Sequence, residues 1–350
     1  MTAHVRAALP VFGGICGAMR TTFSDGSGGT STGMGAIGIV SNPRSRRNRS
    51  HPGTARRLAE LLGDEGELVE ASTLEELDRG LERLRAARVE VLAVNGGDGT
   101  GHVVLTAAAR AWAPAPLPKL LLLRGGAMNT VAHGHGIRGG PERILREVLA
   151  ARRAGVPLRT VERDLLRVEP DGGPARFGFI FGTGVVVTFL ERYYRSVRPS
   201  PATAAVLLVR GFGSALVGGA FAASLTRRER LRVVSDGEEW PDDSFLAVVA
   251  GATPDIGFGF RVFGRCGEQP GFFHAVGVTG TPLQIALALP RIRAGKPWRR
   301  RIALDEVARE LVVEGVEPRF TVDGDLYQAR RTIRVSTGPG VEVILPAPRT

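Results

Sequence analysis

The sequence has few cysteines, few lysines and no long apolar run. Its two cysteines, Cys16 and Cys266, are too few for a disulfide framework and do not recur at metal-ligand spacing. This favours reduced thiols and a cytoplasmic protein. No segment reaches the roughly 18 uninterrupted apolar residues of a membrane-spanning helix. The nearest segment, 202–225, is interrupted by Arg210 and several glycines, so we expect it to be buried or to face a membrane.

The positive charge of the chain is almost entirely arginine. Only Lys119 and Lys296 are lysines among its 46 basic residues, and the formal net charge is +11. Such an excess is attracted to nucleotide phosphates, acidic lipid headgroups or nucleic acid. Nucleic acid is the weakest of the three, because the sequence carries no RNA-binding signature and no aromatic residues interleaved with basic ones. A solvated basic surface is an equally simple explanation.

Length and composition indicate a folded protein of about two domains. The 350 residues are 43% hydrophobic and 23% charged, a globular balance that excludes bulk disorder. Residues 1–35 differ, because glycines and a proline break their apolar part and the rest is rich in Gly, Ser and Thr. We expect them to be a disordered leader rather than a signal peptide.

Between residues 36 and 158, apolar strands alternate with amphipathic helices. This alternation predicts a parallel sheet in an α/β nucleotide-binding domain. A capping box of Ser72 and Glu75, with Thr73 as a neighbouring candidate, is expected to start the second helix. The predicted strands span 36–40, 67–71, 89–94 and 120–123, and the predicted helices span 54–62, 74–84 and 102–113.

After about residue 158 the pattern changes to short apolar runs separated by Gly, Pro or Asp. Such runs are typical of antiparallel strands, so residues 159–350 are predicted to form a β-rich sandwich domain. The predicted strands span 164–168, 177–181, 230–234, 245–250 and 272–278, followed by a strand, a turn and two strands over 320–345.

The strongest functional motif is Gly96-Gly97-Asp98-Gly99-Thr100, which directly follows an apolar strand. Glycines there let the backbone turn tightly and approach a ligand, and the N-terminus of the next helix favours a phosphate. A carboxylate beside phosphates is understandable if it holds Mg²⁺, a water on Mg²⁺ or a proton. The motif is not a P-loop, because no Gly-Lys-Ser/Thr follows, and its spacing is not that of a dinucleotide fingerprint.

Two other clusters have open interpretations. Asp323-Gly324-Asp325 has the composition of a hairpin turn, but a carboxylate there could also take a proton as a general base. Four arginines between residues 44 and 49 follow the first strand, at the edge where parallel sheets collect their ligands. They could face a phosphate or simply form a solvated turn.

Together these motifs resemble the diacylglycerol kinase catalytic family of bacterial lipid kinases, which is related to sphingosine and ceramide kinases. The resemblance covers most of residues 36–348 in order. Asn42-Pro43-Arg44-Ser45 resembles the family's Asn-Pro-x-Ser-Gly turn, and 96–100 match its Gly-Gly-Asp-Gly-Thr loop. Residues 126–132 resemble its Gly-Thr-x-Asn-Asp-x-Ala segment. Asp323-Gly324-Asp325 stands where the family has Asp-Gly-Glu, and 332–346 resemble its closing strands.

The resemblance implies a kinase that uses ATP and Mg²⁺. Asp325 takes the place of the family's catalytic base. Asp98 would organise Mg²⁺ and is therefore both a catalytic and a metal-binding candidate. The residues implied in nucleotide binding are Asn42, Ser72, Gly96, Gly97, Asp98, Gly99, Thr100, Gly126 and Asn129.

The sequence departs from the family at several positions. Ala127 replaces a threonine, which removes one hydroxyl contact to the nucleotide, and Thr130 replaces an aspartate. Asp325 is one methylene shorter than the usual Glu, so the strand must lie closer or the base must work through a water. Pro270 stands where the family often has an Asp that binds a structural Mg²⁺, so we expect that structural site to be absent.

The resemblance implies transfer of the γ-phosphate of ATP to the hydroxyl of a lipid alcohol, with diacylglycerol as the leading acceptor. The lipid would be met at a membrane surface by a cytoplasmic protein that associates peripherally and has no nucleic acid partner; a homodimer is left open. The alternatives are a sphingoid-base or other lipid kinase, an NAD kinase, which shares the central loop, and a degenerate nucleotide- or lipid-binding protein. The Asn-Pro-x-Ser turn and the C-terminal Asp-Gly-acid favour a lipid kinase over an NAD kinase.

Overall fold

The computed structural model describes residues 36–196, 200–216, 227–257 and 259–346. The expected leader, residues 1–35, lies outside these ranges. One apolar core runs through both halves of the described chain, from Ile37 in the first strand to Ile344 in the last. No helix within the described ranges is long and apolar enough to cross a membrane.

The first half is a parallel sheet flanked by helices, which confirms the predicted α/β class. The strands lie in the order β4-β3-β1-β2, and β1 and β3 are buried along their whole length, as expected for a parallel sheet covered by helices. The strands are β1 (Ile37–Ser41), β2 (Gly66–Glu70), β3 (Val91–Asn95) and β4 (Lys119–Leu122). The helices are α1 (Arg46–Ser50), α2 (Thr54–Leu62), α3 (Leu74–Ala86), α4 (Asp98–Trp112), α5 (Thr130–Gly134) and α6 (Pro141–Arg153), with a 3₁₀ turn at Gly63–Glu65.

Two helix starts differ from the sequence prediction. Thr73, not Ser72, is the N-cap of α3, because its hydroxyl accepts a hydrogen bond from the backbone N–H of Glu76 at 3.1 Å. Helix α4 begins at Asp98 rather than near residue 102. The extended backbone of Gly97 places the turn before the motif's aspartate, so Asp98 lies in the first turn of the helix.

The second half continues the first sheet. Strands β5 (Arg159–Pro170) and β18 (Thr332–Leu345) form a long antiparallel pair, and the end of β18 runs parallel to β4. From β18 the sheet extends through β15 (Glu310–Glu314) and β9 (Arg232–Ser235) to β10 (Glu238–Glu239). The last strand of the chain therefore joins the two halves in one ten-stranded sheet. The division at residues 158 and 159 stays a prediction.

A second, antiparallel sheet of six strands belongs wholly to the C-terminal half, as the β-rich prediction requires. Its order is β14-β13-β12-β7-β16-β17. The single strand predicted over 177–181 is wrong, because the chain leaves one sheet at β6 and enters the other at β7. The bounds are β6 (Arg176–Gly178), β7 (Ile180–Thr183), β12 (Ala247–Gly251), β13 (Phe273–Val278), β14 (Ala303–Ala308), β16 (Arg319–Val322) and β17 (Asp325–Gln328); β8 (Glu229–Arg230) and β11 (Ser244–Phe245) form a separate pair.

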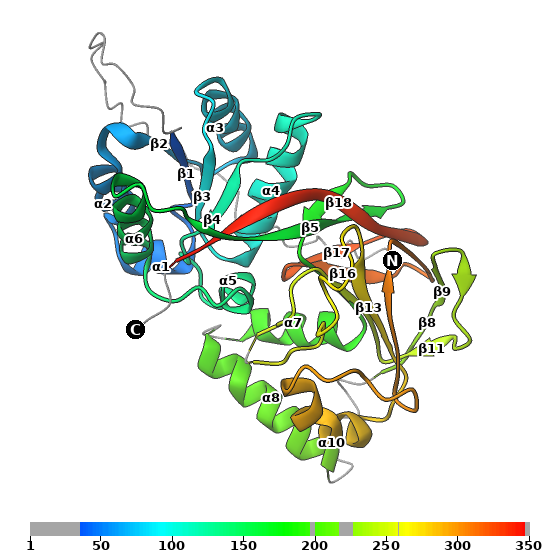
Figure 1. The fold of residues 1–350 in the computed structure, drawn as a ribbon. Helices are drawn as coiled ribbons and strands as arrows, with labels where there is room; N and C mark the ends of the chain where they lie inside the picture. The colour runs from blue at the N-terminus through cyan, green and yellow to red at the C-terminus, as the bar shows by residue number, and fades with distance from the viewer. Residues whose placement is uncertain (1–35, 197–199, 217–226, 258, 347–350) are drawn as a thin grey trace, which may run out of the picture.

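Three helices lie beside the second sheet, at the end of the molecule away from the parallel sheet (Figure 1). They are α7 (Val185–Arg195), α8 (Pro201–Leu216) and α10 (Pro282–Arg293), and α8 packs against both of the others. The apolar segment expected over 202–225 forms α8 in its described part, and residues 217–225 lie outside the described ranges.

Candidate functional site

Two glycine-rich turns meet at the carboxyl ends of β3 and β4. A Cβ added to Gly126 would lie 2.2 Å from the Cα of Gly97, and one added to Gly96 would lie 2.3 Å from the Cβ of Thr100. Only glycine fits at such separations. The sequence therefore brings the backbone of both turns together at the edge of the sheet where ligands bind in α/β folds.

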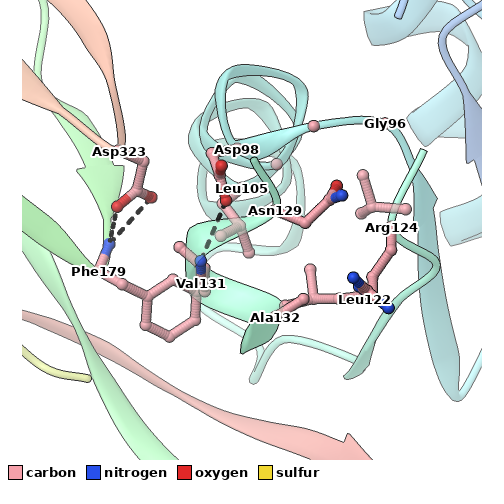
Figure 2. Close-up of a pocket in the computed structure, with 13 residues that line it drawn as sticks. Gly96, Asp98, Leu105, Leu122, Arg124, Asn129, Val131, Ala132, Phe179 and Asp323 are labelled. Atoms are coloured by element: carbon pink, nitrogen blue, oxygen red, sulfur yellow. Dashed lines mark hydrogen bonds between the residues drawn. The ribbon is translucent and has the colours of Figure 1, made fainter. Parts of the chain in front are cut away.

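Asp98 holds these two turns in place. Its carboxylate oxygens accept hydrogen bonds from the backbone N–H groups of Thr130 (2.9 Å) and Val131 (3.0 Å), at the start of α5. Figure 2 shows the Asp98 carboxylate above Val131, with Asn129 beside it. Burial raises the pKa of Asp98, and these hydrogen bonds oppose that rise. Asp98 thus links the Gly-rich loop to the segment after β4.

Two asparagines complete the same edge. Asn42 donates to the hydroxyl of Thr100 at 2.9 Å. Asn129, in the left-handed region at φ 51°, accepts from the N–H of Gly126 at 3.0 Å. The structure therefore brings together all the predicted nucleotide-site residues except Ser72. Ser72 follows the edge strand β2, and its backbone N–H donates a hydrogen bond to the Glu76 carboxylate at 2.7 Å. Its nucleotide role stays a prediction.

Arg124, which follows β4, adds positive charge to this edge. It lines a small cavity of about 20 Å³ together with Gly96, Gly97 and Asn129. Burial and the nearby Arg138 and Arg47 lower its pKa. This crowding of guanidinium groups would be relieved by an anion. Nothing in the sequence pattern singled out Arg124, because it lies outside the arginine cluster at 44–49.

The turn between β16 and β17 brings two carboxylates to the other side of the Gly-rich loop. Asp323 is buried, and its carboxylate accepts hydrogen bonds from the backbone N–H of Phe179 at 3.0 Å, as Figure 2 shows. It also accepts one from the backbone N–H of Ile180 at 2.8 Å. Burial raises its pKa to about 8, although these hydrogen bonds oppose the rise. Asp323 therefore fixes the turn to the junction of β6 and β7.

Asp325 faces the first turn of α4. A Cβ added to Gly99 would lie 2.6 Å from its Oδ1 atom, so the carboxylate sits directly against the Gly-rich loop. Burial, with a further contribution from the negative charge of Asp98, raises the pKa of Asp325 to about 6, and Arg176 opposes the rise. A carboxylate with this pKa is ionised at neutral pH yet more basic than an exposed one.

A buried histidine ties the strand of Asp325 to the helix of Asp98, and sequence reasoning missed it. His102 contacts the carbonyl of Phe177 through Nδ1 (2.8 Å) and the hydroxyl of Tyr327 through Nε2 (2.9 Å). Burial lowers its pKa to about 4, so the ring is neutral at neutral pH. The carbonyl can only accept, so Nδ1 donates and Nε2 accepts from Tyr327. The spacing of four residues from Asp98 on one helix was the available signal.

An apolar cavity of about 460 Å³ opens beside these carboxylates. Its walls are apolar side chains of α7, α8, α10 and the second sheet, among them Phe189, Leu208 and Leu289. Asp98, Gly99, Asp323 and Gly324 line the polar end. Tyr194, at the end of α7, donates its hydroxyl to the carbonyl of Gly324 at 2.9 Å. The site therefore combines a phosphate-type loop, an ionisable carboxylate and a large apolar chamber.

The place expected to lack a structural metal has ordinary hydrogen bonds. The N–H of Gly271 is donated to the Asp164 carboxylate at 2.8 Å, and the carbonyl of Gly271 accepts from Thr337 at 2.8 Å. Within the described ranges, no group of three or more His, Cys, Asp or Glu side chains could hold a metal ion. The absence of that structural site stays a prediction.

Comparison with known proteins finds similarity to diacylglycerol kinases. Residues 36–160 match the family described as diacylglycerol kinase catalytic domain. A search of curated proteins gives no match. The fold is similar to the crystal structure of a diacylglycerol kinase from Bacillus anthracis str. Sterne, at 15% identity and a TM-score of 0.60, over 90% of this chain and 98% of that one. Two more structures from this organism, provisionally assigned as diacylglycerol kinases, match over the same shares at 14% identity with TM-scores of 0.61 and 0.62.

Proposed function

Residues 36–160 belong to the diacylglycerol kinase catalytic domain family, and from this premise we propose that the protein is a lipid kinase. It would use Mg²⁺ and transfer the γ-phosphate of ATP to the hydroxyl of a lipid alcohol, with diacylglycerol as the leading acceptor. The observation that carries the proposal is the apolar cavity of about 460 Å³, whose polar end is formed by Asp98, Gly99 and the turn before Asp325.

The glycine turns are the proposed site of the ATP phosphates. The N-terminus of α4 presents N–H groups and the positive end of its dipole next to Gly96 and Gly97, and α4 is long enough, at 15 residues, for this effect. Arg124 adds a positive charge on the same side. Asn42 and Asn129 hold the two turns that surround this position.

A divalent cation fits between the phosphate loop and the second carboxylate. Asp98 raises the pKa of Asp325 through like-charge repulsion, which a cation between them would relieve. Mg²⁺ commonly uses one or two carboxylates and completes its shell with water and substrate phosphates, so a cluster of three protein ligands is not required. Asp98 would hold it, directly or through a bound water, and when bound it would neutralise phosphate charge during transfer.

Asp325 is the proposed general base. As the lipid hydroxyl oxygen forms its bond to the γ-phosphorus, the bond between that phosphorus and the bridging oxygen of ADP breaks, and the hydroxyl proton passes to the Asp325 carboxylate. Its side chain is shorter than the family's glutamate. The close contact with Gly99 supports a direct role, because the strand lies near enough for the shorter side chain to reach the loop.

The cavity is the proposed site of the acyl part of the acceptor. Its volume lies within the range of about 300–1,000 Å³ typical of small-molecule sites, and its walls are almost entirely apolar. Such walls suit a hydrocarbon chain and offer few hydrogen bonds to the polar ribose and pyrophosphate of NAD. A long-chain amino alcohol is the second candidate acceptor, because an amine would meet the carboxylates Asp98 and Asp325. Peripheral association with a membrane belongs to the same proposal.

Transfer of labelled γ-phosphate tests the proposal. Mg·ATP is supplied with detergent-dispersed diacylglycerol, with sphingosine or with NAD, using the wild type, Asp325→Asn and the matched control Asp171→Asn. Asp171 is a half-buried turn aspartate outside the candidate site, and its carboxylate accepts backbone N–H groups of Arg330 and Arg331. We expect a labelled lipid with the wild type and the control and none with Asp325→Asn. Labelled NADP alone, or ATP binding without transfer, would contradict a lipid kinase. Asp98→Asn is less informative, because it also weakens the link to α5.

A further inference from the structure

The excess positive charge of the chain is concentrated in two segments. Residues 192–228 and 269–304 together contain twelve of the 46 basic residues and none of the 35 acidic ones. The rest of the chain has 34 basic and 35 acidic residues and is nearly neutral. The two segments contain α8 and α10, which pack against each other. The net charge of +11 is therefore carried by these two segments of the sequence rather than by the chain as a whole.

Exposed apolar side chains gather on the same two helices. Val206 and Val209 of α8 are 56% and 71% exposed, and Leu283 and Leu287 of α10 are 42% and 69% exposed. They stand three and four residues apart, so each pair shares one face of its helix. Among the described residues these four make up nearly half of the exposed large hydrophobic side chains. The outer faces of α8 and α10 thus carry apolar side chains that the described residues leave exposed.

The inner faces of the same helices are also apolar, because they form the wall of the large cavity. Leu207 and Leu208 of α8 and Ile285 and Leu289 of α10 line it. A helix that is apolar on two sides is normally covered on both. Of the residues that the structure describes, those around the cavity cover the inner side, and the four side chains above stay exposed on the outer side. The loop that directly follows α10 carries Lys296 and the arginines 299–301, all of them exposed, so positive charge continues from the end of this helix.

We propose that the outer face of α8 and α10, with the basic loop 294–302, docks on an anionic lipid bilayer. Apolar side chains enter the boundary between headgroups and acyl chains, while arginine and lysine contact acidic headgroups, the combination typical of peripheral membrane helices. This inference rests on the proposed function, since docking would place the cavity next to the bilayer that contains the lipid acceptor. The docking itself can be measured without any kinase reaction.

Flotation with lipid vesicles tests the apolar part of the face. The full chain is mixed with vesicles of phosphatidylcholine alone, or of phosphatidylcholine with about 30% phosphatidylglycerol. We expect at least roughly tenfold stronger partitioning onto the anionic vesicles. The double variant Val209→Glu with Leu287→Glu should bind the anionic vesicles at least roughly tenfold more weakly than the wild type. The matched control is Val156→Glu with Val316→Glu, since these side chains are 55% and 96% exposed outside α8 and α10.

Charge reversal tests the basic part. Changing Arg299, Arg300 and Arg301 to Glu should lower binding to the anionic vesicles by roughly tenfold or more, and added salt should weaken wild-type binding in the same direction. The control changes three exposed arginines on other helices, Arg79, Arg85 and Arg110, to Glu. Equal loss in the control, or equal wild-type binding to neutral and anionic vesicles, would overturn the proposal. The proposal would also be overturned if the wild type were a dimer and Val209→Glu dissociated it without changing vesicle binding. A second copy of the chain would then cover the face.

Kinase assays separate this inference from the proposed function. The docking variants keep every residue of the proposed active site, so they should phosphorylate detergent-dispersed acceptor at the wild-type rate and lose activity on vesicle-embedded acceptor. If the wild type binds anionic vesicles but phosphorylates no lipid, docking stands and the lipid kinase proposal fails. If it phosphorylates dispersed lipid but does not bind vesicles, docking fails and the lipid kinase proposal stands.

Discussion

A single methyl group at Gly99 should remove activity without harming the fold. Gly99 lies in the first turn of α4, where alanine is normally favourable by up to about 1 kcal/mol. Its added Cβ would lie 2.6 Å from Oδ1 of Asp325 and 3.2 Å from Cγ. Ordinary contact begins at 3.4 Å, so the carboxylate must retreat by roughly 0.5–1 Å.

A displacement of this size matters if Asp325 is the base. A misplacement of about 1 Å can cost about 100-fold in rate, which corresponds to about 2.7 kcal/mol of transition-state stabilisation. We therefore expect the kcat of Gly99→Ala on lipid acceptor to fall by roughly 100-fold. The melting temperature should stay within a few degrees of the wild type, because the helix itself gains slightly.

Gly101→Ala is the matched control for this experiment. Gly101 lies on the same helix two residues later, and a Cβ there would meet no heavy atom within 4 Å. Thermal unfolding and initial-rate assays on both variants separate helix propensity from displacement of the carboxylate. Full activity in Gly99→Ala, or equal loss in Gly101→Ala, would refute the placement of Asp325 as the group that meets the acceptor hydroxyl.

Three further predictions concern the surroundings of Asp325. Burial and Asp98 raise the pKa of Asp325 to about 6, and a base must be ionised to act, so kcat/KM should fall as the pH drops below about 6. Because Arg176 lowers this pKa, Arg176→Leu should move the acid limb of the pH–rate profile to higher pH. Tyr327→Phe leaves Nε2 of His102 buried without its donor and should cost about 1–3 kcal/mol in urea unfolding, an effect that an unchanged midpoint would contradict. Leu208→Trp should raise KM for long-chain acceptors more than for short-chain ones, and an equal rise would argue against the cavity as the acyl site.

The first half of the fold could be predicted closely because its signals are local. The strands β1, β3 and β4 are largely apolar runs of four or five residues, and each is followed by a turn with glycine, asparagine or proline. The second half was predicted only as a class. Whether β6 and β7 form one strand or two depends on Asp323, which takes the N–H groups of Phe179 and Ile180 from 143 and 144 residues away. No local pattern carries such a contact.

The candidate site shows the same difference. The predicted residues of the two glycine-rich turns stand where a tight backbone turn requires glycine or a side chain that hydrogen-bonds the backbone. The structure brings them together at the carboxyl-end edge of the parallel sheet. Arg124 and His102 were missed, because their contribution comes from where distant elements place them. His102 meets Tyr327 across 225 positions of sequence. Ser72 was chosen for its place at the start of the second helix, where the resemblance implies a polar residue. In the structure its N–H donates to Glu76 of that same helix.

The three aspartates around the Gly-rich loop are distinguished by their hydrogen bonds rather than by their positions in sequence. Asp98 and Asp323 each accept backbone N–H groups, from α5 and from the junction of β6 and β7, so both are held as parts of the frame. Within the described part of the chain, no protein donor reaches the Asp325 carboxylate. Its neighbours are Gly99, which leaves it space, and Arg176, which moderates its pKa. Asp98 and Asp323 thus have satisfied oxygens, whereas the Asp325 carboxylate beside the Gly-rich loop has free ones. A general base needs free oxygens, because it must accept its proton from the substrate.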